Sequence, residues 1–265
     1  MIEASQIAIV IILFHPTDDD RKSVAHISEL YHKVVIDNSE DNKGIAIAQN
    51  IGIQRVMEHP EITHVVFLDQ DSRLADDYPL SIAREFERIS QTMRLAFLGP
   101  SVKNECTGQE YKSVIHQDQM TYEGFIPRRE VISSGGCTTT DCIRDIGFND
   151  GKLFIDYVDF EWCWRAKAQG YICGITPNLS ISHQVGRKSV NLFGFLIILS
   201  APYRYFYQFR NYFWLIGRKY VPLQWKIAMG IKSIARLIYF PLCIKQGFQC
   251  WRYMLKGILA GIRKK

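Results

Sequence analysis

The sequence predicts an α/β fold, with a doubly wound, mostly parallel sheet flanked by helices and followed by a basic amphipathic helical extension. The first part of the chain alternates short, continuous apolar runs with segments of helical period, which is typical of buried parallel strands joined by crossover helices. The last part is rich in Lys, Arg and aromatic residues and contains no acidic residue. With 265 residues, 47% of them hydrophobic, the chain is long enough for one large globular domain and an appendage.

Four short runs of apolar or β-branched residues predict strands that are buried on both faces. They span residues 7–14, 33–36, 64–68 and 95–98. The segments of helical period between them span residues 20–31, 44–58 and 79–92. Because ligands of parallel sheets bind at the carboxyl ends of the strands, we expect functional residues directly after these runs.

The middle of the chain predicts further elements. A loop-like segment ends in SSGG at residues 133–136, and a short helix is expected over residues 140–147. An amphipathic helix is predicted over residues 154–169, where Gly170 stops it. A strand-like stretch then runs to His183.

The C-terminal part predicts an extension with a different character. After Pro222, Lys and Arg are spaced among large apolar residues, as in basic amphipathic helices. We predict a catalytic domain over residues 1–215 and a membrane-associating extension over residues 216–265. No segment offers about 20 consecutive apolar residues, so a spanning helix is not expected. The apolar run near the N-terminus lacks a basic region and a cleavage site, which favours a strand over a signal peptide.

The charges of the chain divide at residue 161. All 27 Asp and Glu residues lie at or before this position together with 15 Lys and Arg, whereas the rest of the chain carries 17 Lys and Arg. This asymmetry indicates an anionic partner for the C-terminal part, which could be nucleic acid, an anionic membrane or a phosphate-bearing substrate. The seven cysteines form no CxxC pair, which favours a reducing, cytoplasmic compartment.

The first candidate for a metal-binding site is Asp69-Gln70-Asp71, directly after the third predicted strand. Two carboxylates at i, i+2 can share a hard divalent cation with phosphate oxygens, because Mg²⁺ and Mn²⁺ prefer oxygen ligands. Such an ion would stabilise the charge that develops on a leaving diphosphate. The alternative is an ordinary acidic turn after a strand.

Two other strand ends carry candidate residues. Asp37, after the second strand, could accept a hydrogen bond from a nucleobase or ribose, and its alternative is turn chemistry within Asp37-Asn38-Ser39. His183 precedes Gly186 and the basic pair that follows it, so it could bind a metal or the diphosphate. A lone histidine at a strand end can equally be structural.

Three acidic residues fall in the predicted helix over residues 154–169. Asp156 and Asp159, at i, i+3, would share one face, whereas Glu161 lies on another. A carboxylate at a helix N-terminus that faces a cleft is a candidate general base for a sugar hydroxyl, and the alternative is an acidic first turn that complements the helix dipole. We predict Asp159 as the base and Glu161 as the ion-pair partner of Arg165 at i+4.

An ordered set of motifs runs along the chain. The motifs are VVIDNS, N-x-G-x-A-x-A-x-N-x-G, FLDQDS, SSGG, FIDYVDFEWCWRAKAQGY, H-x-x-G and RYFYQFRN. Taken together, the set resembles the family 2 glycosyltransferases of the GT-A fold, particularly their bacterial rhamnosyltransferase branch, over roughly residues 5–215.

The resemblance implies an inverting, metal-dependent transfer, in which the acceptor hydroxyl attacks the anomeric carbon opposite the departing nucleoside diphosphate. The implied roles are donor binding by Asp37, Asn42, Asp69, Gln70 and Asp71, binding of Mg²⁺ or Mn²⁺ by Asp71, Asp69 and His183, an acceptor-side position for Ser134, Gly135, Gly136 and Asp156, and general base catalysis by Asp159. Because Val158 replaces the acidic residue that commonly precedes the base in the family, Asp156 stays open as the alternative base.

The same resemblance implies dTDP-L-rhamnose as the donor and a growing lipid-linked surface polysaccharide, such as an O-antigen, as the acceptor. A peripheral, cytoplasmic position at the inner face of the cell membrane would suit the basic extension, since each nearby Lys or Arg contributes about 1 kcal/mol of attraction to anionic lipid. We expect the aromatic residues up to about position 215 to pack on the catalytic core, and residues 222–265 to contact the membrane.

Three other functions compete with this interpretation. A nucleic-acid-binding protein would explain the basic, aromatic C-terminal part but not the acidic strand ends, and no nucleic-acid partner is expected. A nucleotidyltransferase could also use an acidic metal-binding pair, but no Gly-rich phosphate loop with a Lys follows the first strand. A catalytically silent relative would bind the donor without transferring the sugar.

Overall fold

The computed structural model describes residues 2–72, 74–104, 124–183, 188–192 and 195–263. Its main sheet has seven strands in the order β2-β1-β3-β6-β4-β7-β5. They are β1 (Ile7–Leu13), β2 (His32–Asp37), β3 (His64–Asp69), β4 (Leu95–Asn104), β5 (Ile126–Arg128), β6 (Cys137–Thr139) and β7 (Ile172–His183). β1 pairs in parallel with β2 and β3, and β4 pairs in parallel with β7, whereas β5 and β6 are antiparallel to their neighbours. The prediction of a mostly parallel sheet is confirmed.

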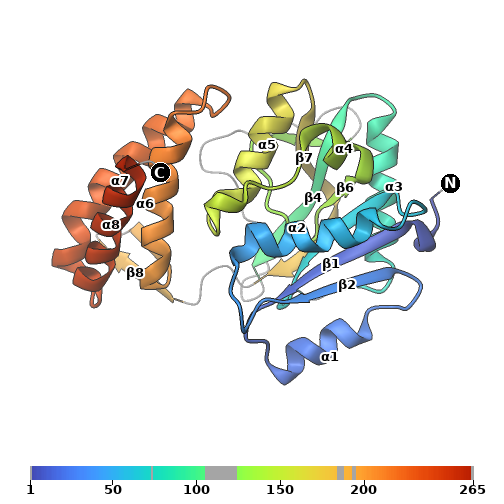
Figure 1. Ribbon diagram of the computed structural model, residues 1–265, viewed down its shortest axis with the longest axis horizontal. Helices are drawn as coiled ribbons and strands as arrows, with labels where there is room; N and C mark the ends of the chain where they lie inside the picture. The colour runs from blue at the N-terminus through green and yellow to red at the C-terminus, as the bar shows by residue number, and fades with distance from the viewer. Residues whose placement is uncertain (1, 73, 105–123, 184–187, 193–194, 264–265) are drawn as a thin grey trace.

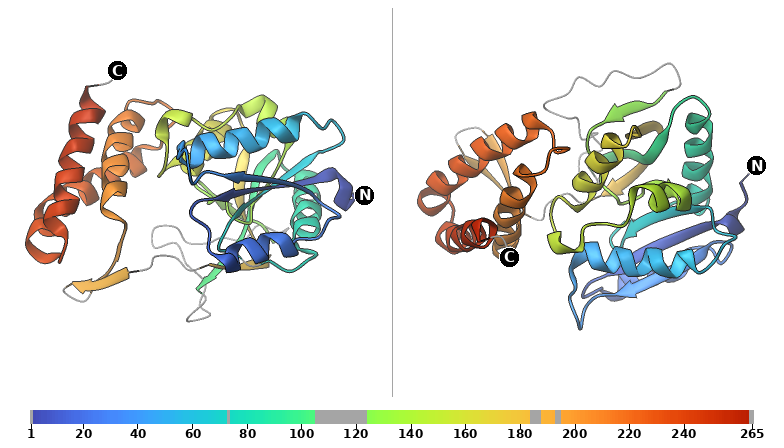
Figure 2. Two further views of the ribbon diagram at one scale, coloured as in Figure 1. Left: turned by 60° about the horizontal axis from the view of Figure 1, so that its bottom comes forward. Right: turned by 45° about the horizontal axis from the view of Figure 1, so that its top comes forward.

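Helices cover both faces of the sheet, and α1 and α2 lie on opposite faces (Figure 2). The helices of this body are α1 (Asp18–His26), α2 (Gly44–Met57), α3 (Tyr78–Ser90), α4 (Thr140–Ile146) and α5 (Val158–Ala168), with short 3-10 turns η1 (Ala4–Gln6) and η2 (Gly151–Leu153). All seven residues of β1 are buried, as the continuous apolar run predicted. The core therefore sits between the sheet and its two helical layers.

The predicted helix over residues 154–169 is wrong at its start, because α5 begins only at Val158. Phe154, Asp156 and Tyr157 have left-handed backbone angles, with φ of +65°, +67° and +66°. An α-helix cannot continue through such residues. Asp156 and Asp159 therefore do not share a helix face, and only Asp159 belongs to the first turn of α5.

The C-terminal part forms a helical group beside the sheet body (Figure 1). It consists of α6 (Pro202–Ile216), α7 (Leu223–Cys243) and α8 (Gly247–Ile262), preceded by the hairpin of β8 (Lys188–Leu192) and β9 (Phe195–Leu199). Glycines let α8 approach α6 closely, since a Cβ on Gly257 would lie 2.4 Å from the carbonyl oxygen of Phe206. The predicted helical extension is confirmed, whereas the domain boundary at residue 215 stays a prediction.

Aromatic and charged side chains fasten this helical group to the sheet body. Trp225 of α7 packs edge-on against Trp164 of α5, with 4.8 Å between ring centroids. Arg218 donates a 2.9 Å hydrogen bond to Glu161 and pairs with Asp150. The start of α5, where the base was predicted, is thus held partly by residues of the C-terminal helices.

Candidate active site

Asp69-Gln70-Asp71 lies at the carboxyl end of β3, in the middle of the sheet. The Gln70 amide nitrogen lies 3.5 Å from Asp20 Oδ2, and its carbonyl oxygen accepts a 2.6 Å hydrogen bond from the backbone N–H of Phe14. These bonds fasten the turn to β1 and α1. Asp69 is half-buried and Asp71 is exposed.

Residues 133–136 run directly alongside this turn. The Ser134 hydroxyl oxygen accepts a 3.3 Å hydrogen bond from the N–H of Asp69 and lies 2.9 Å from the hydroxyl of Ser72. The N–H of Gly135 donates to the carbonyl of Phe67 at 2.8 Å, which joins the segment to β3. The predicted SSGG loop therefore belongs to the same site as the acidic pair.

Packing requires the two glycines of this loop. The N–H of Gly136 donates to the carbonyl of Ser133 at 2.8 Å, and that of Gly135 donates to the carbonyl of Phe67. A Cβ on Gly136 would lie 2.3 Å from the ring of Phe97. Gly135 also adopts φ +73°, which residues with a Cβ rarely do. Their acceptor-side position stays a prediction.

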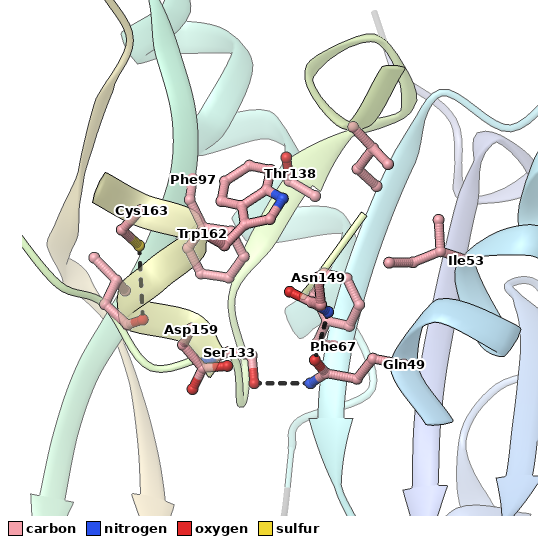
Figure 3. Close-up of a pocket in the computed structure, with 12 residues that line it drawn as sticks. Gln49, Ile53, Phe67, Phe97, Ser133, Thr138, Asn149, Asp159, Trp162 and Cys163 are labelled. Atoms are coloured by element: carbon pink, nitrogen blue, oxygen red, sulfur yellow. Dashed lines mark hydrogen bonds between the residues drawn. The ribbon is translucent and has the colours of Figure 1, made fainter. Parts of the chain in front are cut away.

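Asp159, in the first turn of α5, lies beside Ser133, the first residue of the same loop (Figure 3). The N–H of Ser133 donates a 3.3 Å hydrogen bond to its Oδ2. Burial, followed by the negative charge of Asp69, raises the pKa of Asp159 to about 6, against the opposing effect of the Ser133 hydrogen bond. The Asp69 and Asp159 carboxylates thus lie close enough to repel each other, on either side of Ser133-Ser134.

A hollow of ≈ 30 Å³ extends behind Asp159 into the core. Gln49 of α2 crosses its mouth, where its amide donates a 3.0 Å hydrogen bond to the Ser133 hydroxyl and accepts one of 3.0 Å from Asn149. A hollow of this size has room for a water molecule but not for a sugar ring. Gln49 and Asn149 therefore support the loop that holds Asp159.

Asp156 lies close to Asp159 in the sequence, but its carboxylate is engaged elsewhere. Arg204 of α6 donates to both carboxylate oxygens, at 3.2 Å from Nε and 2.6 Å from Nη2. Both oxygens of the Asp156 carboxylate are therefore engaged by the guanidinium in a bidentate ion pair. This contact favours Asp159 as the base, and the acceptor-side role of Asp156 stays a prediction.

Asp37 and Asn42 lie around the end of β2. The Asp37 carboxylate accepts hydrogen bonds from the N–H and hydroxyl of Ser39, and these bonds hold its pKa below the ordinary value, with a smaller contribution from Arg21. The Asn42 side chain accepts from the N–H of Gly44 at 3.0 Å and shapes the entry into α2. Turn chemistry therefore accounts for these bonds apart from the ion pair with Arg21 of α1, and the roles of Asp37 and Asn42 in donor binding stay predictions.

The described residues contain no group of three or more His, Cys, Asp and Glu side chains that would hold a metal ion. His183 ends β7 and pairs with Asn104 of β4 in the backbone register, but its side chain falls outside the described residues. The predicted cation ligands Asp69 and Asp71 follow each other at the end of β3, and their binding of a metal ion stays a prediction. Such a pair suits an ion whose remaining ligands come from substrate phosphates and water.

Comparison with known proteins assigns the chain to a family. The chain is 33% identical over 233 residues to the dTDP-rhamnosyl transferase RfbF of Shigella flexneri, which covers 84% of this chain and 76% of that protein. The chain belongs to the rhamnosyltransferase-like glycosyltransferases. It is therefore a glycosyltransferase, which agrees with the prediction of sugar transfer. No protein-family model matches the chain.

Solved structures show that the fold of this glycosyltransferase is GT-A. Residues 1–349 of S. aureus TarS match with a TM-score of 0.55 at 12% identity, covering 97% of this chain and 81% of that chain. The complex of the same TarS fragment with UDP-GlcNAc matches with a TM-score of 0.53 at 11% identity, covering 96% and 81%. GalNAc-T7 with UDP, GalNAc and Mn²⁺ matches with a TM-score of 0.50 at 11% identity, covering 68% and 44%. The predicted fold is confirmed.

Several residues of this glycosyltransferase site were missed by the sequence analysis. Gln49 lies in the N-x-G-x-A-x-A-x-N-x-G motif, and its 3% exposure marks it as a polar residue on a buried helix face. Asn211, in RYFYQFRN, is completely buried. In both cases the sequence signal was an amide side chain among the apolar residues of a helix. Such a signal predicts a structural hydrogen bond, because buried amides need partners.

Proposed function

We propose that this glycosyltransferase transfers L-rhamnose from dTDP-L-rhamnose to a hydroxyl of a lipid-linked surface-polysaccharide precursor, with inversion at the anomeric carbon. The dTDP-rhamnosyl transferase relative supports the choice of donor. The observation that carries the proposal is the position of Asp159, a carboxylate with a raised pKa, across Ser133-Ser134 from the strand-end Asp69.

Asp159 acts as the general base in this proposal. Its carboxylate accepts the proton of the acceptor hydroxyl while the hydroxyl oxygen attacks the anomeric carbon. The bond from that carbon to the diphosphate oxygen breaks, and dTDP leaves with the electron pair. A pKa near 6 leaves the carboxylate ionised at neutral pH and makes it a stronger base than an ordinary aspartate.

Asp69 and Asp71 are the residues that would hold a divalent cation, with His183 as a further predicted ligand. Two carboxylates at a strand end fit Mg²⁺ or Mn²⁺, because these ions commonly take one or two carboxylates together with substrate phosphates. The Mn²⁺ in the GalNAc-T7 structure supports a divalent ion in this fold. When bound, the ion would neutralise the charge of the leaving diphosphate.

In this proposal the C-terminal helices attach the enzyme to the inner face of the cell membrane, where it would meet a lipid-linked acceptor. No Asp or Glu follows Glu161, and this absence of negative charge favours an anionic surface as the partner of the C-terminal helices. Within the parts of the chain that the structure describes, none of the helices is both long and apolar enough to cross a bilayer. The attachment proposed is accordingly peripheral.

Donor and metal binding can be tested with one panel. With Mg²⁺ or Mn²⁺ present, we expect dTDP-L-rhamnose, among a set of nucleotide-sugars, to raise the melting temperature and to be hydrolysed slowly. At a donor concentration of 100 times Kd the stabilisation is about 2.7 kcal/mol. Asp71→Asn and addition of EDTA should each remove most of it, because both remove the cation that links the donor to the protein.

The control for this panel is Asp141→Asn, which changes an exposed aspartate of α4 and should leave donor stabilisation intact. Asp141 follows Thr139, which pairs with the first residue of β3, whereas Asp71 follows the last. If no nucleotide-sugar stabilises the protein and EDTA makes no difference, donor binding at this site is refuted. If another nucleotide-sugar is preferred, the rhamnose assignment fails while sugar transfer stands.

A further inference from the structure

The outward face of α7 carries six large apolar side chains in a row. Their exposed fractions run from 55% to 80%. They are Leu223, Ile227, Ile231, Ile234, Ile238 and Leu242, and we call them the α7 stripe. At about 100° per residue all six fall within an arc of about 100°, and at 1.5 Å per residue they extend over about 28 Å.

The opposite face of α7 packs against the rest of the protein. The stripe is therefore a surface of the folded protein and not the face by which α7 joins the core. Phe240 is completely buried and packs edge-on against Tyr205 of α6 at 5.0 Å. Trp225 packs against Tyr157 at 5.1 Å, and the carbonyl of Lys226 accepts a 3.0 Å hydrogen bond from Tyr212. The helix is therefore fixed in rotation, and the stripe faces away from the protein. Exposed apolar patches of this extent mark interaction sites.

The charges of the C-terminal helices indicate which partner fits the stripe. The neighbouring helix α8 exposes Phe248, Leu259 and Ile262 alongside Arg252 and Lys256. With no acidic residue after position 161, two copies of this face would bring together positive charges with no carboxylate between them. A lipid surface with anionic headgroups offers both an apolar layer and the opposite charge.

We propose that the α7 stripe lies in the interfacial layer of an anionic membrane, with the exposed basic residues Lys232 of α7 and Arg252 and Lys256 of α8 at the headgroups. The proposal deepens the peripheral attachment proposed above and rests on it. It goes further by naming one helix face as the inserted surface. This face also fixes the orientation of the enzyme, because α7 is packed against α5 through Trp225 and Trp164.

The test is co-sedimentation of the full chain with phosphatidylcholine vesicles that contain phosphatidylglycerol. We expect Ile234→Ser/Ile238→Ser to weaken vesicle binding at least about tenfold, since two large apolar side chains lose their burial. Leu30→Ser is the matched control, because Leu30 is 71% exposed on the sheet body. Pure phosphatidylcholine vesicles should bind the wild type weakly.

Two outcomes would overturn the proposal. One is equal vesicle binding by the stripe variant and the wild type. The other is a wild type that sediments as a dimer without vesicles and a stripe variant that sediments as a monomer, which would mean that a second copy covers the stripe. Donor hydrolysis, measured in parallel without vesicles, should be unchanged in the stripe variant. The experiment therefore distinguishes failure of the proposed donor binding from failure of the proposed membrane insertion.

A second observation, independent of the stripe, concerns how Asp159 is held. The segment before α5 reaches toward α6 (Figure 1), where the buried Asn211 amide nitrogen lies 2.9 Å from the carbonyl oxygens of Leu153 and Ile155 and 3.1 Å from that of Asp156. Arg204, also on α6, holds the Asp156 carboxylate in a bidentate pair. Together these contacts fix a turn that its own residues disfavour, because they carry a Cβ and have left-handed φ.

We infer that Arg204 and Asn211 are positioning residues for the base Asp159. The turn they hold enters α5 directly, and Asp159 lies in the first turn of that helix. A shift of the turn would move the Asp159 carboxylate relative to Ser133, its 3.3 Å donor. Displacements of about 1 Å at a reacting group can cost about 100-fold in rate. The inference rests on the proposed role of Asp159.

Steady-state kinetics and donor-induced melting shifts test this second proposal. Arg204→Gln should lower kcat about tenfold or more, with donor affinity unchanged, because the donor side of the site is untouched. Asp156→Asn/Arg204→Gln should cost no more than the single change, since both remove the same pair. The control is Gln208→Ala, which removes a 2.9 Å bond to Arg236 within the helical group without touching the turn.

An unchanged kcat in Arg204→Gln would refute the positioning role. A parallel loss of kcat and donor affinity would show general damage to the fold and would refute it as well. Asp159→Asn is measured alongside, because full transfer by that variant would refute the base itself and not its positioning.

Discussion

Replacing Asp159 with Asn is expected to lower kcat for sugar transfer by about 10²- to 10⁴-fold, the usual contribution of a general base. Asn keeps the size of the side chain and can still accept the hydrogen bond from the N–H of Ser133, but it cannot take the acceptor proton. Donor binding should survive, because the strand-end pair Asp69 and Asp71 is unchanged. The loss should therefore fall on kcat and leave the KM for the donor nearly the same.

The same substitution should make the metal-free protein more stable at neutral pH. Burial and the neighbouring Asp69 raise the pKa of Asp159 from 3.8 to about 6 in the folded protein. Between these two values the folded state retains a proton that the unfolded chain has released, so the free energy of unfolding falls as the pH rises. Above pH 6 both states are ionised, and the cost to the folded state is constant, at most about 3 kcal/mol. Asn carries no such cost.

Urea unfolding in EDTA from pH 4 to 8, together with transfer assays, measures both effects. The stability gain of Asp159→Asn should be largest above pH 6 and should vanish toward the ordinary Asp pKa of 3.8. Asp141→Asn, at an exposed position, should show neither change. A variant that transfers sugar normally, or that is less stable than the wild type at pH 7, would contradict the assignment of Asp159 as a strained, functional carboxylate.

The sheet and its strand ends could be predicted from the sequence because their signals are local. Continuous apolar runs such as residues 7–14 mark strands buried on both faces, and the observed β1 ends within one residue of that prediction. Ligands of parallel sheets bind at the carboxyl ends of the strands, so the sequence also indicated where to look for Asp69 and Asp71, which follow from the end of β3. The i, i+4 pair of Glu161 with Arg165 is likewise local and is confirmed, with Nε 3.1 Å from Oε1.

The turn before α5 could not be predicted, because its cause lies far away in the sequence. Residues 154–157 continue the helical pattern of α5, but the Asn211 amide, more than fifty positions later, gathers their carbonyl groups and holds the left-handed conformation. The partner of Asp156 was missed for the same reason, since Arg204 belongs to α6 and contacts the Asp156 carboxylate only in the folded chain. A pattern within one segment carries no information about such contacts.

Removing the buried carboxylate of Glu161 is expected to destabilise the fold by about 3–5 kcal/mol, the usual cost of breaking one side of a buried ion-pair network. Glu161 is 1% exposed and accepts hydrogen bonds from Arg165 at 3.1 Å, from Arg218 at 2.9 Å and from the hydroxyl of Tyr220. Glu161→Ala would remove the carboxylate that Arg165 and Arg218 share, and Arg218 would keep only Asp150 of its two carboxylate partners. At about 2–4 °C per kcal/mol, the melting temperature should fall by roughly 6–20 °C.

Two comparisons separate this network from an ordinary surface ion pair. Glu161→Gln keeps a hydrogen-bond acceptor and should lose less stability than Glu161→Ala, because only the charge is removed. Arg144→Ala breaks an exposed i, i+3 pair with Asp141 and should cost less than about 1 kcal/mol. Equal effects of Glu161→Ala and Arg144→Ala would contradict the network. A large effect would mean that Glu161 joins α5 to the C-terminal part of the chain through Arg218, so that α5 and the C-terminal helices support each other in the folded protein.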